Sequence, residues 1–126
     1  MYYTFIDKHH TGIPWITFVH PLKQALVTQL VKEVPAWVDY LIIFGSSVTP
    51  NCYAHSDLDI CVIGKPTEPI SNLFPCLDHE EKDIIFKTSI HDLRASLDAQ
   101  PSGIISDILS KGVVIYAHEK NLNPTG

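Results

Sequence analysis

The sequence is short of positive charge, and above all of arginine. Of its 126 residues, 9 are Lys or Arg and 14 are Asp or Glu, which gives a formal net charge of -5. Arg94 is the single arginine, so an anion site in this chain cannot be built from an arginine cluster. Broad binding to a polynucleotide needs a basic face that displaces counterions. The composition therefore argues against nucleic acid as a partner.

Paired cysteines and long apolar runs are also lacking. The chain has three cysteines, Cys52, Cys61 and Cys76, an odd number without a C-x-x-C motif or the spacing of a disulfide framework. We therefore expect reduced thiols, as is usual in the cytoplasm. Residues 1–20 contain no charged segment followed by an apolar one, which is the pattern of a secretory leader. No apolar run approaches about 20 residues, the length that spans a bilayer. We expect a cytoplasmic protein with no membrane partner.

The length fits one domain, residues 1–126, with one core. We interpret residues 1–19 as a family-specific extension and residues 118–126 as a polar tail. Helical spacing and Pro21 at a first helical position predict a helix, with Pro35 ending it. Its predicted apolar face consists of Leu22, Ala25, Leu26 and Leu30.

Short apolar runs between turn residues predict four strands, at 39–44, 58–63, 82–88 and 113–117. Further helices are expected at 90–98 and 102–111, and a short one near 70–74. The apolar face of the helix at 102–111 is predicted to consist of Ile104, Ile105, Ile108 and Leu109. This order predicts a mixed α/β fold, with helices packed on a β-sheet.

Asp57 and Asp59 stand one residue apart where the second strand begins. Side chains at i and i+2 of a strand share a face, about 7 Å apart. Two carboxylates so placed repel each other, and a hard divalent cation relieves that repulsion. The alternative is a solvated strand end, because a D-x-D sequence is common.

Gly45 and Ser46 follow the first buried strand directly. A glycine there lets a phosphate approach the backbone, and the amides and the Ser46 hydroxyl can donate to it. A simple turn is the competing interpretation. If the strands at 39–44 and 58–63 are neighbours, phosphate donors and metal ligands share one edge of the sheet.

Asp83 opens the third strand, before a run of apolar residues. An acid at the mouth of a buried strand is costly unless it is solvated or bound. We therefore take Asp83 as the third carboxylate, although an exposed strand end would look the same. The competitors for this role are Asp78, Glu80, Glu81 and Asp92.

The segment from Gly45 to Ile60, GSSVTPNCYAHSDLDI, resembles the signature of DNA polymerase β-like nucleotidyltransferases. More narrowly, it resembles the minimal nucleotidyltransferase (MNT) domains. That signature is Gly-Ser, about ten residues, then Ser-Asp-x-Asp and an apolar strand. The resemblance extends over residues 22–117, and it implies the polymerase β-like fold. Ser47, Thr49 and Pro50 depart from the pattern, because the family often carries basic residues and a second glycine there. Phosphate charge is then left to metal ions and to lysines such as Lys65, Lys82 or Lys87.

The resemblance implies a Mg²⁺-dependent nucleotidyltransferase, with two ions and with Mn²⁺ as a substitute. Asp57, Asp59 and Asp83 would be the metal ligands and catalytic residues, while Gly45, Ser46 and Ser56 would bind the nucleotide. The substrate would be a nucleoside triphosphate, by preference ATP, whose AMP passes to a hydroxyl group. Asp83 would lie on the acceptor side.

The MNT resemblance also implies a partner, a helical HEPN-type toxin for which the MNT protein is the antitoxin. The chain has no obvious acceptor-binding domain, so we expect a partner or a second copy of the chain to supply that surface. Two alternatives stay open. One is a non-catalytic antitoxin that acts by occlusion, and the other is transfer to a small antibiotic within a homo-oligomer.

Overall fold

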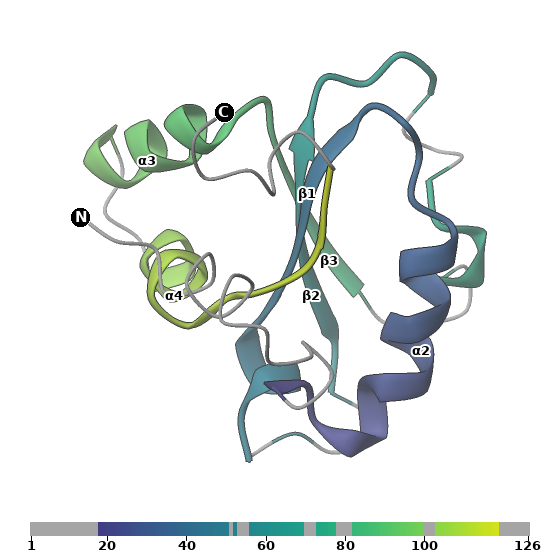
Figure 1. Cartoon of the computed structure of the whole chain (residues 1–126). Coiled ribbons are helices and arrows are strands. Elements are labelled where there is room, and N and C mark those ends of the chain that lie inside the picture. Colours follow the sequence, from purple (N-terminus) through teal and green to yellow (C-terminus); the bar gives the residue numbers. More distant parts are fainter. Residues whose placement is uncertain are drawn as a thin grey trace.

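A computed structural model describes residues 18–50, 52, 56–69, 73–77, 82–99 and 103–118 of the chain. Four strands form one sheet, with helices on both of its faces (Figure 1). In chain order the elements are α2 (Pro21–Lys32), β1 (Val38–Phe44), η2 (Gly45–Val48), β2 (Leu58–Gly64), η4 (Pro75–Leu77), β3 (Lys82–Lys87), α3 (Ile90–Ala99), α4 (Gly103–Lys111) and β4 (Val113–Ala117). The predicted mixed α/β class is confirmed.

The sheet has the strand order β3-β2-β1-β4. β1 pairs antiparallel with both β2 and β4, whereas β2 and β3 run parallel. The two most apolar strands, β1 and β2, are therefore central, as expected for strands that are buried on both faces. The structure has the four predicted strands, each within a residue or so of the predicted bounds.

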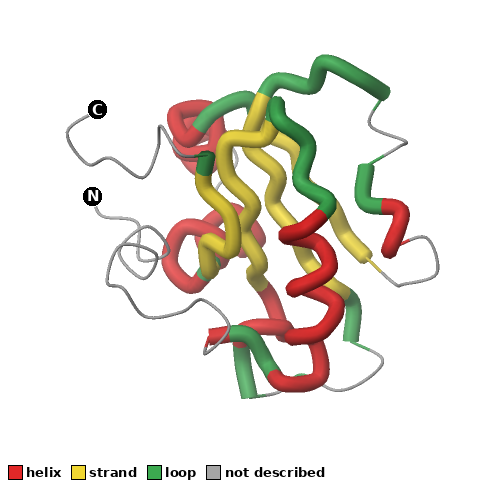
Figure 2. Tube along the Cα trace, turned by 45° about the vertical axis from the view of Figure 1, so that its right-hand side comes forward, coloured by secondary structure: helices red, strands yellow, loops and turns green. Residues whose placement is uncertain are grey.

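One face of the sheet is covered by α2, together with η4 (Figure 1 and Figure 2). The His20 imidazole caps α2 by accepting from the Leu22 amide at 3.2 Å. The predicted apolar face of α2 was wrong in part, because Leu22 is 54% exposed and Ala25 is exposed. Leu30 is buried as predicted, and Val27 joins it in the buried face, because the stripe that contacts the sheet continues toward Val34.

α3 and α4 cover the opposite face (Figure 1). Asp92 stabilises the start of α3, where its carboxylate accepts from the Thr88 amide at 3.0 Å and the Ser89 hydroxyl accepts from the Asp92 amide at 3.0 Å. Ile105, Ile108 and Leu109 form the buried face of α4, as predicted. Ile104 was assigned to that face wrongly, since its side chain is 54% exposed.

The outer parts of the chain yield little for comparison. Residues 1–17, most of the expected extension, and residues 119–126 of the tail lie outside the described residues, as do 70–72 of the short helix expected near 70–74. Beyond that gap the chain forms the 3-10 turn η4. Within the described ranges, every helix is too short or too polar to cross a bilayer.

Candidate active site

Three strands bring the candidate residues to one edge of the sheet. Asp59 near the start of β2 pairs with Phe44, the last residue of β1, and with Asp83 near the start of β3. Gly45 follows Phe44 directly. The end of β1 and the starts of β2 and β3 therefore meet at the same level, which is the juxtaposition predicted from the sequence.

The strand alternation directs both acids toward the same layer. On β2, Cys61 and Ile63 belong to the core between the sheet and α3 and α4, and on β3 Ile85 packs against that core. Asp59 lies two residues before Cys61 and Asp83 two before Ile85, so both acids continue these rows on the same face. At this edge each row changes from apolar to acidic.

Gly45 is fitted closely to Asp59. Its φ of +72° lies in the left-handed region that favours glycine. A Cβ atom placed on Gly45 would overlap the Asp59 Oδ2 atom. Glycine is therefore required here twice, once by the backbone conformation and once by the approach of the carboxylate.

The environment of Asp59 disfavours its charge. Partial burial, the negative charge of Asp83 and a side-chain hydrogen bond to Asp83 raise the pKa of Asp59 from 3.8 to about 6, with smaller contributions from Asp57 and Asp107. Two hydrogen-bonded carboxyl groups hold a proton between them more readily than either does alone. The pair thus carries more negative potential than the site tolerates without a proton or a cation.

The two acids lie in a pocket that α4 completes. Its volume is about 580 Å³, and it is lined by Phe44, Gly45, Asp59, Asp83, Ile84, Ile85, Gly103, Ile104 and Asp107. A pocket of this size is in the range that small-molecule ligands occupy. Ile84, Ile85 and Ile104 give it an apolar side, opposite in character to its carboxylates.

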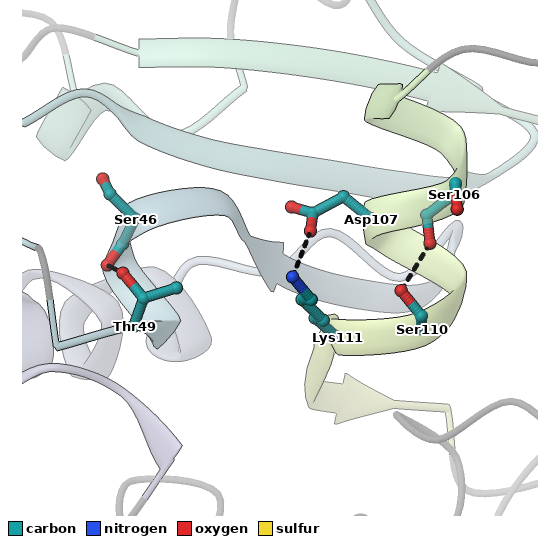
Figure 3. A network of polar contacts seen from close by, with 6 residues as sticks. All are labelled: Ser46, Thr49, Ser106, Asp107, Ser110 and Lys111. Carbon is teal, nitrogen blue, oxygen red and sulfur yellow. Dashed lines mark hydrogen bonds and ion pairs between the residues drawn. The ribbon is translucent and has the colours of Figure 1, made fainter.

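Asp107 is a pocket residue that the sequence reasoning missed. It is half-buried on α4 and forms an ion pair of 3.9 Å with Lys111, one turn further along the helix (Figure 3). In the sequence, Asp107 and Lys111 stand four residues apart and outside the predicted apolar face, which marks them only as neighbours on the surface of the helix. Sequence neighbours gave no hint that this second face of α4 approaches β2.

The remaining predicted residues are placed as follows. Asp57 is exposed directly before β2, and Ser56 before it is buried. Ser46 is half-buried in η2, where its carbonyl oxygen accepts from the amide and the hydroxyl of Thr49, both at 3.0 Å (Figure 3). Asp92, a competitor for the third acid, is engaged at the start of α3, while Asp78, Glu80 and Glu81 lie outside the described residues.

The carboxylates at this edge suit a divalent cation in part. Asp59 and Asp83 offer two adjacent carboxylates, and partial burial together with the charge of Asp83 raises the pKa of Asp59, as suits a hard cation with oxygen ligands. Asp57 acts on Asp59 through its charge. Within the part of the chain that the structure describes, however, no three His, Cys, Asp or Glu side chains are grouped to hold a metal ion. The pair fits, and the third ligand is not assembled with it.

Comparison with known proteins adds a family match. A family model described as polymerase beta, nucleotidyltransferase, matches residues 27–121, three quarters of the chain. No curated protein matches the chain at a significant level.

Among solved structures, the chain is similar to a toxin–antitoxin complex with AMP-PNP and to the toxin–antitoxin complex MntA–HepT. The first similarity has a TM-score of 0.47 and 18% identity, over 79% of this chain and 76% of that one. The second has a TM-score of 0.43 and 16% identity, over 82% of this chain and 77% of that one.

Proposed function

Because the chain belongs to the polymerase beta nucleotidyltransferase family, we propose that it transfers AMP from ATP to a hydroxyl group of a protein partner. One observation carries this proposal. The carboxyl groups of Asp59 and Asp83 meet in a pocket beside Gly45, the residue that opens the turn after β1.

The residues divide the reaction between them. The turn that begins at Gly45 and Ser46 receives the β and γ phosphates at its amides, which places the α-phosphorus toward Asp59. The acceptor oxygen attacks that phosphorus, and the bond to the bridging oxygen breaks. Pyrophosphate then leaves with the bonding electrons. Asp83 lies on the acceptor side and takes the proton of the hydroxyl group.

Asp59 and Asp83, joined by Asp57, would hold Mg²⁺, which supplies charge neutralisation at the attacking and leaving oxygens when it is bound. Asp59 has to lose its proton before it can act as a ligand. Binding of the cation should therefore release a proton and strengthen as the pH rises through about 6, the pKa of Asp59.

The nature of the partner rests on the sequence. The segment from Gly45 to Ile60 resembles MNT domains, which pair with helical HEPN-type toxins. The described elements build the sheet and its covering helices, and none of them forms a separate acceptor-binding domain. We therefore assign this chain the part of the antitoxin in such a cytoplasmic pair, with a tyrosine or another hydroxyl of the toxin as the acceptor.

A second candidate function is occlusion without catalysis. It is favoured by two features of the described residues, the exposed position of Asp57 and the lack of a group of three metal-binding side chains. In that case the chain would inhibit its partner by covering it, and the pocket would have no catalytic function.

The decisive experiment incubates the chain with ATP, Mg²⁺ and its co-encoded partner and records the intact mass of the partner. We expect the partner to gain the mass of one AMP group. Asp59→Asn should lower the rate by at least about 100-fold, because the lost charge acts in the transition state.

The comparison that separates the two candidates uses the double variant Asp57→Ala, Asp59→Ala. Under the transferase proposal this variant binds the partner but leaves it active and unmodified. If the variant inhibits the partner as well as the wild-type chain does, and no nucleotide yields an adduct, occlusion is the function.

A further inference from the structure

We propose that Lys111, held at the pocket by Asp107, is the residue that binds the terminal phosphates of the nucleotide. This inference rests on the proposed function, and it answers a question of charge. The pocket contains three carboxylates, those of Asp59, Asp83 and Asp107, and no basic side chain lines it. A triphosphate brings further negative charge to this place.

The turn after β1 carries no basic side chain. Positions 47 and 49, where the resemblance leads one to expect basic residues, hold Ser47 and Thr49. The Ser47 side chain is fully buried, and its hydroxyl has no hydrogen-bond partner. The Thr49 hydroxyl donates to the Ser46 carbonyl oxygen. A cation for the phosphates has to come from another element.

The lysines named from the sequence do not reach this edge. Lys82 donates to the Leu77 carbonyl oxygen at 2.8 Å and so extends toward η4. Lys87 pairs with Ile63 at the far end of the sheet, about 13 Å along the strand from Asp83 at 3.3 Å per residue. Lys65 lies beyond the same far end of β2, about 20 Å from Asp59 on that measure.

The other described basic residues lie elsewhere in the fold. Lys23 and Lys32 belong to α2, which covers the opposite face of the sheet, and Arg94 is on α3. Lys8 and Lys120 lie outside the described residues. Lys111 therefore stands out among the described residues as the cation tied to a side chain of the pocket.

The position of Lys111 suits the task. α4 contacts both η2 and β1, and Figure 3 shows Asp107 and Lys111 on α4 with the Ser46–Thr49 turn across from them. The Lys111 side chain is 69% exposed, so its ammonium group is free to move. An exposed pair at 3.9 Å holds its partners only weakly, and the ammonium group can exchange Asp107 for a phosphate at small cost.

This arrangement gives Asp107 a role, which is to keep Lys111 near the pocket. The Asp107 carboxylate adds negative charge to the pocket that it lines, and this charge disfavours the binding of an anion. By retaining Lys111 near the pocket mouth, Asp107 offsets part of that charge before the nucleotide arrives. The alternative is an ordinary i,i+4 pair on a helix surface, which would have no effect on ligand binding.

The test measures the affinities of the full chain for ATP and for AMP by calorimetry in excess Mg²⁺. Lys111→Met should weaken ATP binding by about tenfold, as expected for the loss of one charge-assisted contact to phosphate. AMP lacks the terminal phosphates, so its affinity should not change. Lys111→Arg keeps the charge and should retain most of the preference for ATP.

Lys32→Met is the matched control. Lys32 is an exposed lysine in the last turn of α2, as Lys111 is in the last turn of α4, so both variants change the net charge and a helix end equally. An equal loss of ATP affinity in both variants would reduce the effect to long-range charge and overturn the proposal, as would an unchanged ATP-to-AMP ratio in Lys111→Met. If the wild-type chain binds neither nucleotide, the proposed function fails, and this inference fails with it.

Discussion

The two faces of the sheet are built differently, and the contrast is sharpest at neighbouring residues of β2. Leu58 belongs to the core on the α2 face and is fully buried, whereas Asp59 points to the α4 face and lines a pocket. The core on the α2 side includes residues from α2 and from the segment around η4 that are at most 1% exposed, namely Val27, Leu30, Phe74 and Leu77.

On the α4 side the apolar contact stops short of that edge. Ile105, Ile108 and Leu109 of α4 pack into the core on this face, while Ile104 is exposed and Asp107 lines the pocket. The difference teaches that one face supplies stability and the other leaves room for a ligand. Substitutions on the two faces should therefore separate the free energy of unfolding from nucleotide binding.

The largest effect is expected on the α2 face, where a substitution in the core should lower the free energy of unfolding. Leu30→Ala removes a fully buried side chain from the α2 core, and it should lower the free energy of unfolding by about 2–5 kcal/mol, because the cavity collapses only in part. The measurement is urea unfolding. Where the variant is folded, its ratio of ATP to AMP affinity should equal that of the wild-type chain.

Leu22→Ala on the same helix is the control, because Leu22 is 54% exposed and its loss should cost little. If Leu30→Ala instead alters the ATP-to-AMP ratio while Leu22→Ala does not, the two faces are coupled. The separation of stability from binding would then be wrong.

A smaller effect, on the rate of AMP transfer, is expected from Gly45→Ala at the edge of the sheet where Asp59 and Asp83 line the pocket. The new Cβ atom would overlap the Asp59 carboxylate, and the positive φ disfavours any side chain. Displacing a reacting group by about 1 Å can cost about 100-fold in rate, so we expect AMP transfer to fall by that order, as followed by the mass of the partner.

Gly103→Ala is the matched substitution for the fold, because a Cβ atom there meets nothing within 4 Å. Gly103→Ala should not lower the melting temperature, whereas Gly45→Ala should lower it measurably. If Gly45→Ala transfers AMP at the wild-type rate, Asp59 does not take part in the reaction.

The sequence predicted the strands and the pairing of the candidate edge well, for a physical reason. The buried strands β1 and β2 appear in the sequence as continuous apolar runs. The motif from Gly45 to Ile60 predicts that the end of β1 lies beside the start of β2, and the pairing of Phe44 with Asp59 confirms this. The family match likewise confirms the resemblance to polymerase β-like nucleotidyltransferases. The roles of the individual site residues stay predictions.

The three long helices were predicted close to their observed bounds, but their buried faces were predicted less well, because a helix presents several faces and tertiary contact decides which one is buried. Leu22 and Ile104 looked like core residues, but both are exposed. Asp107 was invisible as a pocket residue, since only the packing of α4 against β1 and η2 brings it near Asp59. Single-residue spacing within one element does not carry that information.

The smallest expected effect is a dependence of stability on pH that arises from Asp59 at the edge of the sheet that carries the pocket. The pKa of Asp59 is raised from 3.8 to about 6, so between these values the folded chain holds a proton that the unfolded chain has released. Stability should therefore fall as the pH rises from about 4 to about 6 and then level off, because folding is linked to the extra proton. The burial and repulsion that raise the pKa are partly screened by water, so the slope should be shallow.

Asp59→Asn isolates this contribution, because its amide does not titrate. Urea unfolding in metal-free buffer should find the variant gaining stability relative to the wild-type chain as the pH rises from 4 to 6. Asp83→Asn removes the strongest of the charges that raise the pKa of Asp59, so it should move the wild-type window to lower pH without abolishing it, since burial still acts. If the difference between wild type and Asp59→Asn is the same at pH 4 and pH 7, Asp59 titrates alike in the folded and unfolded chains. Repulsion and burial at Asp59 and Asp83 would then not favour a bound proton or cation, and this difference between the α4 face and the α2 face would be wrong.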